Sequence, residues 1–116
     1  MAQWTVEFYV TAAGRRPVQE YLDQLEGREA WSVVNALQLL QEHGLELGLP
    51  HVRPIERKLW ELRVRAQRQH RVFYVAASGR RFVLLHAFTK QTAQAPRREI
   101  EIALRRLSDY QERGTL

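Results

Sequence analysis

Alternating apolar and polar residues predict β-strands at the start of the chain and again in its second half. In residues 3–10 (QWTVEFYV), every second side chain from Trp4 to Val10 is apolar, which is typical of a half-buried strand. Short polar breaks separate three further strand-like segments, and breaks of that length favour hairpins in an antiparallel meander. These three predicted strands are Leu59–Ala66, His70–Ala76 and Phe82–Phe88.

Apolar residues spaced three and four positions apart predict three helices. The first begins at Pro17, which loses no hydrogen bond in a first turn, and ends at Gly27. The second covers Arg28–His43 and is followed by Gly44, a residue type common just after a helix. The third begins at Pro96. Their apolar faces contain Val18, Tyr21, Leu22 and Leu25 in the first, Ala30, Val33, Val34, Leu37 and Leu40 in the second, and Ile100, Ala103, Leu104 and Leu107 in the third.

The remaining segments are predicted to be loops. Leu45–Glu56 contains two prolines and a glycine, and Thr89–Ala95 follows the last strand. The order of elements is therefore β-α-α-β-β-β-α within a single domain, residues 1–116. This order predicts a small α+β fold, in which an N-terminal helix hairpin and a C-terminal helix pack on a mostly antiparallel sheet.

Charge changes this picture, because the cations gather in the second half of the chain. The net charge is +5; residues 1–50 hold three basic and seven acidic residues, whereas residues 51–116 hold fifteen basic and six acidic ones. An asymmetry of this size favours a polyanionic partner over an ordinary solvated surface. Sixteen of the eighteen cations are arginine, whose planar fork suits phosphate oxygens, although an acidic protein would suit it as well.

The predicted strands place several of these cations on one face of the sheet. Side chains alternate between faces, so Val64 is expected to lie against the helix hairpin while Arg63 and Arg65 project from the opposite face. If the next strand pairs as a hairpin, Arg71 becomes the neighbour of Arg63. Two guanidinium groups side by side repel each other. Either a bound phosphate or nearby carboxylates such as Glu61 would neutralise them.

The histidines and other reactive side chains give weaker indications of a functional site. His86, on an apolar strand, is typical of a satisfied core histidine, and His70, beside a hairpin, is expected to be exposed. The four histidines lack metal-ligand spacing and no cysteine is present, so we expect no metal and no cofactor. The first residues lack the features of a signal peptide, and no apolar run is long enough for a membrane helix. A cytoplasmic protein is therefore expected.

Four sequence blocks stand in a distinctive order. They are KLWELR (58–63), HRVFYV (70–75), VLLHAFTKQT (83–92) and the helix EIEIALRRLSDY (99–110). In this order and spacing, the blocks resemble the phage-derived, HigB-like branch of the RelE/ParE toxin superfamily. The leading VEFY strand and the helix hairpin also fit, so the resemblance covers about residues 4–110. It implies a compact sheet flanked by helices and a toxin of a type II toxin–antitoxin pair.

The resemblance also implies an activity. RelE- and HigB-type toxins enter the ribosomal A site and cut mRNA without a metal, by attack of a ribose 2′-hydroxyl on the adjacent phosphate. This chemistry needs proton transfer and cations that stabilise the extra charge on the phosphate. By matching motif positions, the resemblance implies catalytic roles for Arg63, Arg71, Lys90 and Lys58. Further contacts with RNA are predicted for Arg57, Arg65, Arg68 and His86.

Partners follow from the same resemblance, and two other functions are open. The implied partners are a helix-turn-helix antitoxin of HigA type and mRNA on the ribosome, contacted together with ribosomal RNA. One alternative is a ParE-like inhibitor of DNA gyrase that does not cut RNA, because fold alone does not determine function. The other is a non-toxic, nucleic-acid-binding phage remnant. The cationic sheet favours the RNA-cleaving toxin.

Overall fold

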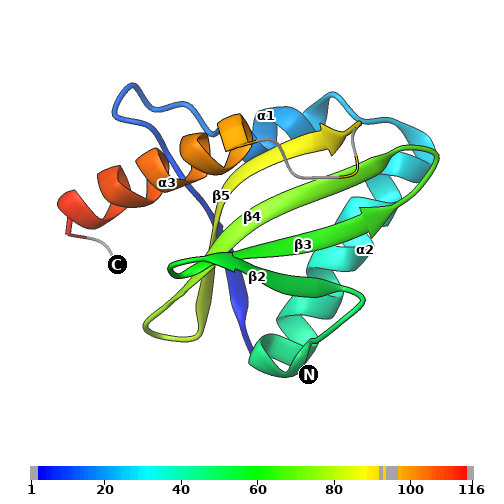
Figure 1. Ribbon diagram of the computed structural model, residues 1–116, viewed down its shortest axis with the longest axis horizontal. Coiled ribbons are helices and arrows are strands. Elements are labelled where there is room, and N and C mark those ends of the chain that lie inside the picture. Colours follow the sequence, from blue (N-terminus) through cyan, green and yellow to red (C-terminus); the bar gives the residue numbers. More distant parts are fainter. Residues whose placement is uncertain (1–2, 92, 94–96, 115–116) are drawn as a thin grey trace.

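The computed structural model describes residues 3–91, 93 and 97–114 (Figure 1). Within these residues the chain forms three α-helices, one short 3-10 helix and a sheet of five strands. The elements are β1 (Thr5–Phe8), α1 (Pro17–Asp23), α2 (Gly27–His43), η1 (Gly44–Glu46), β2 (Val52–Glu56), β3 (Leu59–Arg65), β4 (Gln69–Ala77), β5 (Arg81–Lys90) and α3 (Arg97–Glu112). The predicted α+β class is confirmed.

The sheet is antiparallel except at one edge. Its strand order is β1-β5-β4-β3-β2, and the second half of the chain builds it as a meander from β2 to β5. The N-terminal strand β1 lies parallel to β5, where the register pairs Thr5 with Arg81 and Phe8 with Leu84. The mostly antiparallel sheet and the hairpins between the predicted strands are therefore confirmed.

The predicted loop over Leu45–Glu56 is wrong in its second half. Residues Val52–Glu56 form the edge strand β2, which pairs antiparallel with β3 and shifts register between Pro54 and Glu56. Proline removes a hydrogen-bond donor and is tolerated in a strand at a sheet edge, which is where Pro54 lies. The order of elements is consequently β-α-α-β-β-β-β-α, with one strand more than predicted.

Apolar side chains fill both faces of the sheet. On one face, Val33 and Leu40 of α2 belong to a buried cluster with Leu62 of β3, as expected for the face covered by the helix hairpin. On the other face, Phe73 of β4 belongs to a second cluster with Leu107 of α3. Figure 1 accordingly shows α2 and α3 on opposite sides of the strands. Among the described helices, none combines the length and apolar character that a membrane crossing requires.

Several predicted boundaries shift in the structure. The last strand continues through Lys90, so the loop predicted from Thr89 begins later. Gly27 has a φ of 57° and opens α2, whereas α1 has already ended at Asp23. Pro96, the predicted start of the last helix, lies outside the described residues, and α3 is described from Arg97.

Gly44 ends α2 at a position where a side chain has no room. Its φ is 57°, and a Cβ atom there would lie 2.5 Å from Nε1 of Trp4. We expect Gly44→Ala to lower the free energy of unfolding by about 2 kcal/mol or more, through backbone strain and the clash with Trp4. Urea denaturation measures this loss. Gly14→Ala is the matched control, because Gly14 also has a positive φ of 88° but has nothing within 4 Å of the added Cβ. Equal losses in the two variants would contradict the clash.

Candidate nucleic-acid interface

Cross-strand pairing gathers cations on one face of the sheet. Arg63 lies directly opposite Arg71, as predicted, and Arg65 lies opposite Gln69, which in turn lies opposite Lys90. Directly opposite residues of an antiparallel pair point to the same side of a sheet. The polar row Arg65, Gln69 and Lys90 therefore crosses β3, β4 and β5 on one face. Arg63 and Arg71 form a second polar pair on β3 and β4, and the next position of that row, on β5, is the apolar Phe88.

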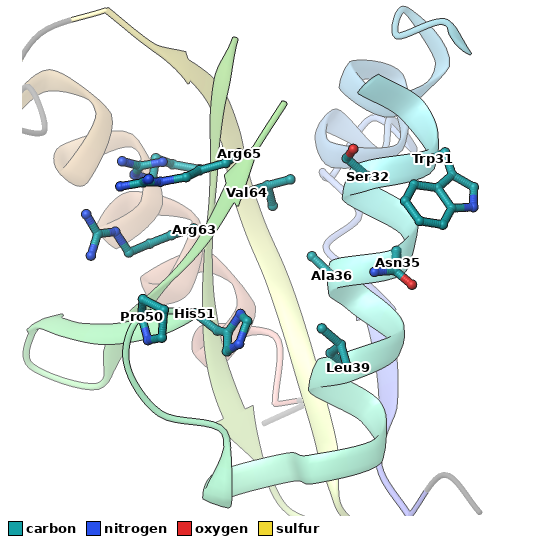
Figure 2. A pocket seen from close by; sticks show the side chains of 11 residues that line it. Trp31, Ser32, Asn35, Ala36, Leu39, Pro50, His51, Arg63, Val64 and Arg65 are labelled. Atoms are coloured by element: carbon teal, nitrogen blue, oxygen red, sulfur yellow. The ribbon is translucent and has the colours of Figure 1, made fainter. Parts of the chain in front are cut away.

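This face is the α3 side of the sheet, beyond the apolar cluster beneath α3. Phe73 and Phe88 belong to that cluster, and Arg71 and Lys90 lie two residues farther along the same strands. Figure 2 shows Arg63 and Arg65 leaving β3 on the side away from α2, while Val64 points towards α2. The alternation predicted for this strand is confirmed. We call Arg53, Arg63, Arg65, Arg71 and Lys90 the cationic face.

A fully buried carboxylate lies among these cations. Glu61 has no exposed surface, and its Oε1 accepts a hydrogen bond from Nε of Arg53 at 2.8 Å. Nε of Arg63 lies 4.0 Å from the same oxygen, and Nε of Arg71 lies 3.6 Å from Oε2. Glu61 thus neutralises part of the cluster, as one interpretation of the sequence anticipated. One carboxylate shared by three arginines leaves the cationic face with an excess of positive charge.

Arg71 forms the floor of the cationic face. Arg71 is only 2% exposed. Its two terminal nitrogens donate hydrogen bonds to the His70 carbonyl at 3.1 Å and to Oε1 of Gln69 at 3.0 Å. Burial lowers the pKa of the Arg71 guanidinium, and the nearby charge of Arg63 acts in the same direction against the opposing effect of Glu61. Arg63 and Arg65, whose side chains reach solvent, are the better placed to contact a ligand directly.

Lys90 borders this floor at the end of β5. Burial lowers the pKa of its ammonium group, and the positive charge of Arg71 lowers it further. An ammonium group with a lowered pKa releases its proton more readily than a free lysine does. Lys90 therefore combines positive charge with a capacity for proton transfer, a combination that the always-charged arginines lack.

Two of the predicted catalytic or RNA-binding residues lie elsewhere. Arg57 and Lys58 form the turn between β2 and β3, at the opposite end of β3 from Arg63. Lys58 precedes Arg63 by five positions along the strand, which corresponds to roughly 17 Å of extended chain. The structure does not bring this turn to the cationic face.

Two further predicted RNA contacts are engaged within the chain. Arg68, in the turn between β3 and β4, forms an ion pair of 2.6 Å with Glu29. His86 lies 2.6 Å from Oε1 of Glu99 through Nε2, and its Nδ1 lies 3.1 Å from a terminal nitrogen of Arg106. Burial lowers the pKa of His86, which favours the neutral imidazole that such an arrangement needs. His86 is thus a satisfied histidine, as its apolar strand predicted.

The expectation that His70 is exposed is wrong. Its side chain is fully buried on the α1–α2 side, with Nδ1 2.5 Å from Oη of Tyr21 and Nε2 3.1 Å from Oε1 of Glu29. Oη of Tyr21 also lies 2.8 Å from Oγ1 of Thr89. A hydrogen-bonded chain therefore ties both N-terminal helices to β4 and β5, close to the ends of the strands that carry the cationic face.

Glu29, at the outer end of this chain, makes the stability depend on pH. Hydrogen bonds from Arg68 are the main cause that lowers the Glu29 pKa from 4.5 to about 2. The ionised form is thus favoured in the folded state, so this stabilisation is present above pH 4.5 and is lost as the pH falls towards 2. We expect Glu29→Gln to unfold at lower urea concentration than the native protein at pH 6, with the gap closing below pH 3. Glu42→Gln, on the exposed side of the same helix, is the control; a gap independent of pH would contradict the linkage.

Sequence reasoning missed one member of the site, Arg53, and the burial of another, Glu61. Arg53 fell within a predicted loop, because Pro50 and Pro54 interrupt the alternation that marks strand β2. The only indication of this strand in the sequence was the apolar residue Val52 followed by the charged Arg53. Glu61 was noted as a neutralising acid, but its complete burial could not be predicted from the sequence, and the strand β2 that places Arg53 opposite it was predicted to be a loop. Among the described residues, no group of three or more His, Cys, Asp and Glu is placed to hold a metal ion.

Fold and site together define a small, basic α+β protein with a cationic sheet face suited to polyanions. Residues 20–108 match the family model described as phage-derived protein Gp49-like (DUF891). This match covers more than half of the chain, which therefore belongs to the Gp49-like family, part of the RelE/ParE-like toxin superfamily. A comparison with curated proteins found no match. The superfamily implied by the four sequence blocks is confirmed, and the HigB branch stays a prediction.

Proposed function

We propose that this protein is the toxin of a type II toxin–antitoxin system and cleaves mRNA on the ribosome as a metal-independent endoribonuclease. The observation that carries this proposal is the cationic face, in which Arg63, Arg65 and Lys90 border the buried Arg71. A cluster with an excess of positive charge attracts the phosphates of RNA. Membership of a superfamily with RNase members supports the same conclusion.

The proposed reaction is a transesterification within the RNA strand. The ribose 2′-hydroxyl gives its proton to solvent water as its oxygen attacks the adjacent phosphorus, and the bond from phosphorus to the 5′-oxygen breaks. The leaving 5′-oxygen takes up a proton, so the products are a 2′,3′-cyclic phosphate and a 5′-hydroxyl. Extra negative charge collects on the phosphate oxygens in the transition state. Preorganised cations at those oxygens lower the barrier.

Each residue of the cationic face has a proposed part in this reaction. Arg63 and Arg65 bind the non-bridging oxygens of the scissile phosphate. Lys90 protonates the leaving 5′-oxygen, because burial and the charge of Arg71 lower the pKa of its ammonium group and make it a stronger acid than a free lysine. Arg71 adds positive charge from below and fixes the geometry of the floor through its bonds to His70 and Gln69.

Mapping of RNA ends tests the proposal and separates it from gyrase inhibition. The toxin should be induced in growing cells, and mRNA 5′ ends should be mapped by primer extension. Cuts within codons that disappear when translation is blocked would support a ribosome-dependent nuclease. Intact mRNA together with inhibited supercoiling by purified gyrase would instead establish the ParE-like alternative. Normal growth on induction would establish the non-toxic alternative.

The proposed partner is a helix-turn-helix antitoxin of HigA type, and both proteins would act in the cytoplasm. An exposed apolar region supports a protein partner. A groove with a volume of about 430 Å³ separates α2 from the edge of β3, and Trp31 on its α2 wall is 67% exposed (Figure 2). Large exposed apolar side chains commonly mark protein interaction surfaces. Co-expression with the product of the adjacent gene, followed by size-exclusion chromatography, tests this partnership.

A further inference from the structure

The burial of the Glu61 carboxylate does not favour the stability of the fold. Oε2 of Glu61 and Nε of Arg71 are buried without a hydrogen-bond partner, although they lie 3.6 Å apart. Burying a charged group is costly unless it is well paired, and apolar residues of similar size often replace buried ion pairs without loss. The carboxylate of Glu61 therefore calls for a role other than packing.

Its position supplies that role. Nε atoms of Arg53, Arg63 and Arg71 lie 2.8, 4.0 and 3.6 Å from the two oxygens of this one carboxylate. Guanidinium groups held so close together repel one another when no anion lies between them. Glu61 supplies such an anion from within the chain. Since Glu61 is fully buried, its carboxylate stays beneath the arginines and out of reach of a ligand on the surface.

We propose that Glu61 is a positioning residue, whose carboxylate holds the guanidinium groups of Arg53, Arg63 and Arg71 in a convergent arrangement before RNA arrives. This inference rests on the proposed function and deepens it. Glu61 has two opposed effects on the reaction. It lowers the positive charge that attracts phosphate, and it aligns the cations that stabilise the transition state. A loss of this carboxylate therefore separates binding from catalysis, which a purely structural residue would not do.

The isosteric variant Glu61→Gln tests the inference through binding and turnover. An RNA oligonucleotide with 2′-O-methyl groups cannot be cleaved and serves as the binding probe. We expect the variant to bind this probe about three- to tenfold more tightly at low salt, because the cluster gains one positive charge. Cleavage of mRNA on ribosomes, measured at saturating toxin, should fall about 10- to 100-fold, because the arginines lose their alignment.

Nitrogen NMR gives a readout that needs neither cleavage nor RNA. The Nε–H group of Arg53 should give a distinct, slowly exchanging signal in the native protein, because it donates a hydrogen bond of 2.8 Å to the carboxylate of Glu61. This signal of Arg53 should broaden in Glu61→Gln. Arg105, on the exposed side of α3, provides an internal reference that should not change.

A charge-balanced double variant keeps the test valid if Glu61→Gln alone fails to fold. Removal of one cation and the carboxylate together, in Glu61→Gln/Arg53→Gln, keeps the net charge of the cluster constant. This double variant should bind the probe with nearly native affinity and still cleave slowly. Binding and turnover that fall together, in proportion to the folded fraction, would make Glu61 purely structural and overturn the inference. A native protein that binds the probe but leaves mRNA intact would overturn the proposed function alone, and the NMR signals and probe affinity would still decide the role of Glu61.

Discussion

Arg63→Ala should lower mRNA cleavage by about 100-fold and restore growth to cells that express the protein. The proposed reaction places this guanidinium on the phosphate oxygens, where a single preorganised donor typically contributes this much. The fold should tolerate the change well, because the side chain is 30% exposed and its nearest carboxylate contact is a long one of 4.0 Å to Glu61. The backbone N–H of residue 63, which donates to the His51 carbonyl at 2.7 Å, is unaffected by the substitution.

Plating efficiency and primer extension measure the result, and urea denaturation confirms that the variant is folded. Arg105→Ala is the matched control, because Arg105 is an exposed arginine on α3 rather than on the cationic face. It should remain fully toxic. Undiminished cleavage by a folded Arg63→Ala/Arg65→Ala double variant would rule out this face as the place of catalysis.

Arg71→Ala is expected to act differently, by destabilising the protein. Arg71 is almost completely buried, donates two hydrogen bonds and lies beside the buried carboxylate of Glu61. Removing it leaves a cavity and deprives Glu61 of a neighbouring cation. We expect the free energy of unfolding to fall by about 2–4 kcal/mol, from lost hydrogen bonds to a charged group and a weakened buried pair. Toxicity should be lost as well.

Equilibrium unfolding in urea, followed by tryptophan fluorescence, measures this effect. Arg65→Ala is the control, since Arg65 lies on the same face but is exposed, so the variant should keep its stability. A fully stable Arg71→Ala protein would show that Arg71 is not part of the floor. Comparing Arg63 with Arg71 thus separates a residue that meets the substrate from one that supports the surface beneath it.

Local sequence patterns predicted most of the secondary structure. Alternation identified the strands containing Val64 and Phe73, and three-and-four spacing identified the helices around Leu37 and Leu107. These patterns work because the burial of one face imposes a period on each element by itself. Strand β2 escaped prediction because Pro54 breaks that period, and an edge strand tolerates such a break.

The predicted arrangement of residues was correct where it depended on the pairing of neighbouring strands. The turn between β3 and β4 is short, so the pairing of Arg63 with Arg71 followed from the sequence. Prediction of the arrangement was less successful for residues outside these paired strands or covered by distant segments. Lys58 belongs to a matching motif but lies in a turn at the far end of β3, and His70 is covered by two helices from the start of the chain.

By itself, the sequence determined every strand and helix except β2, the superfamily, and the face of the sheet on which Arg63 and Arg65 lie, because periodicity and motifs are local properties of the chain. Only the tertiary structure decided the depth of each charge. Arg71 is buried, and Glu61 lies at the centre of three arginines, because β2 brings Arg53 alongside β3. The surroundings of a charge depend on which segments pack beside it. Here the neighbouring strand, β2, comes from a segment whose own pattern predicted a loop.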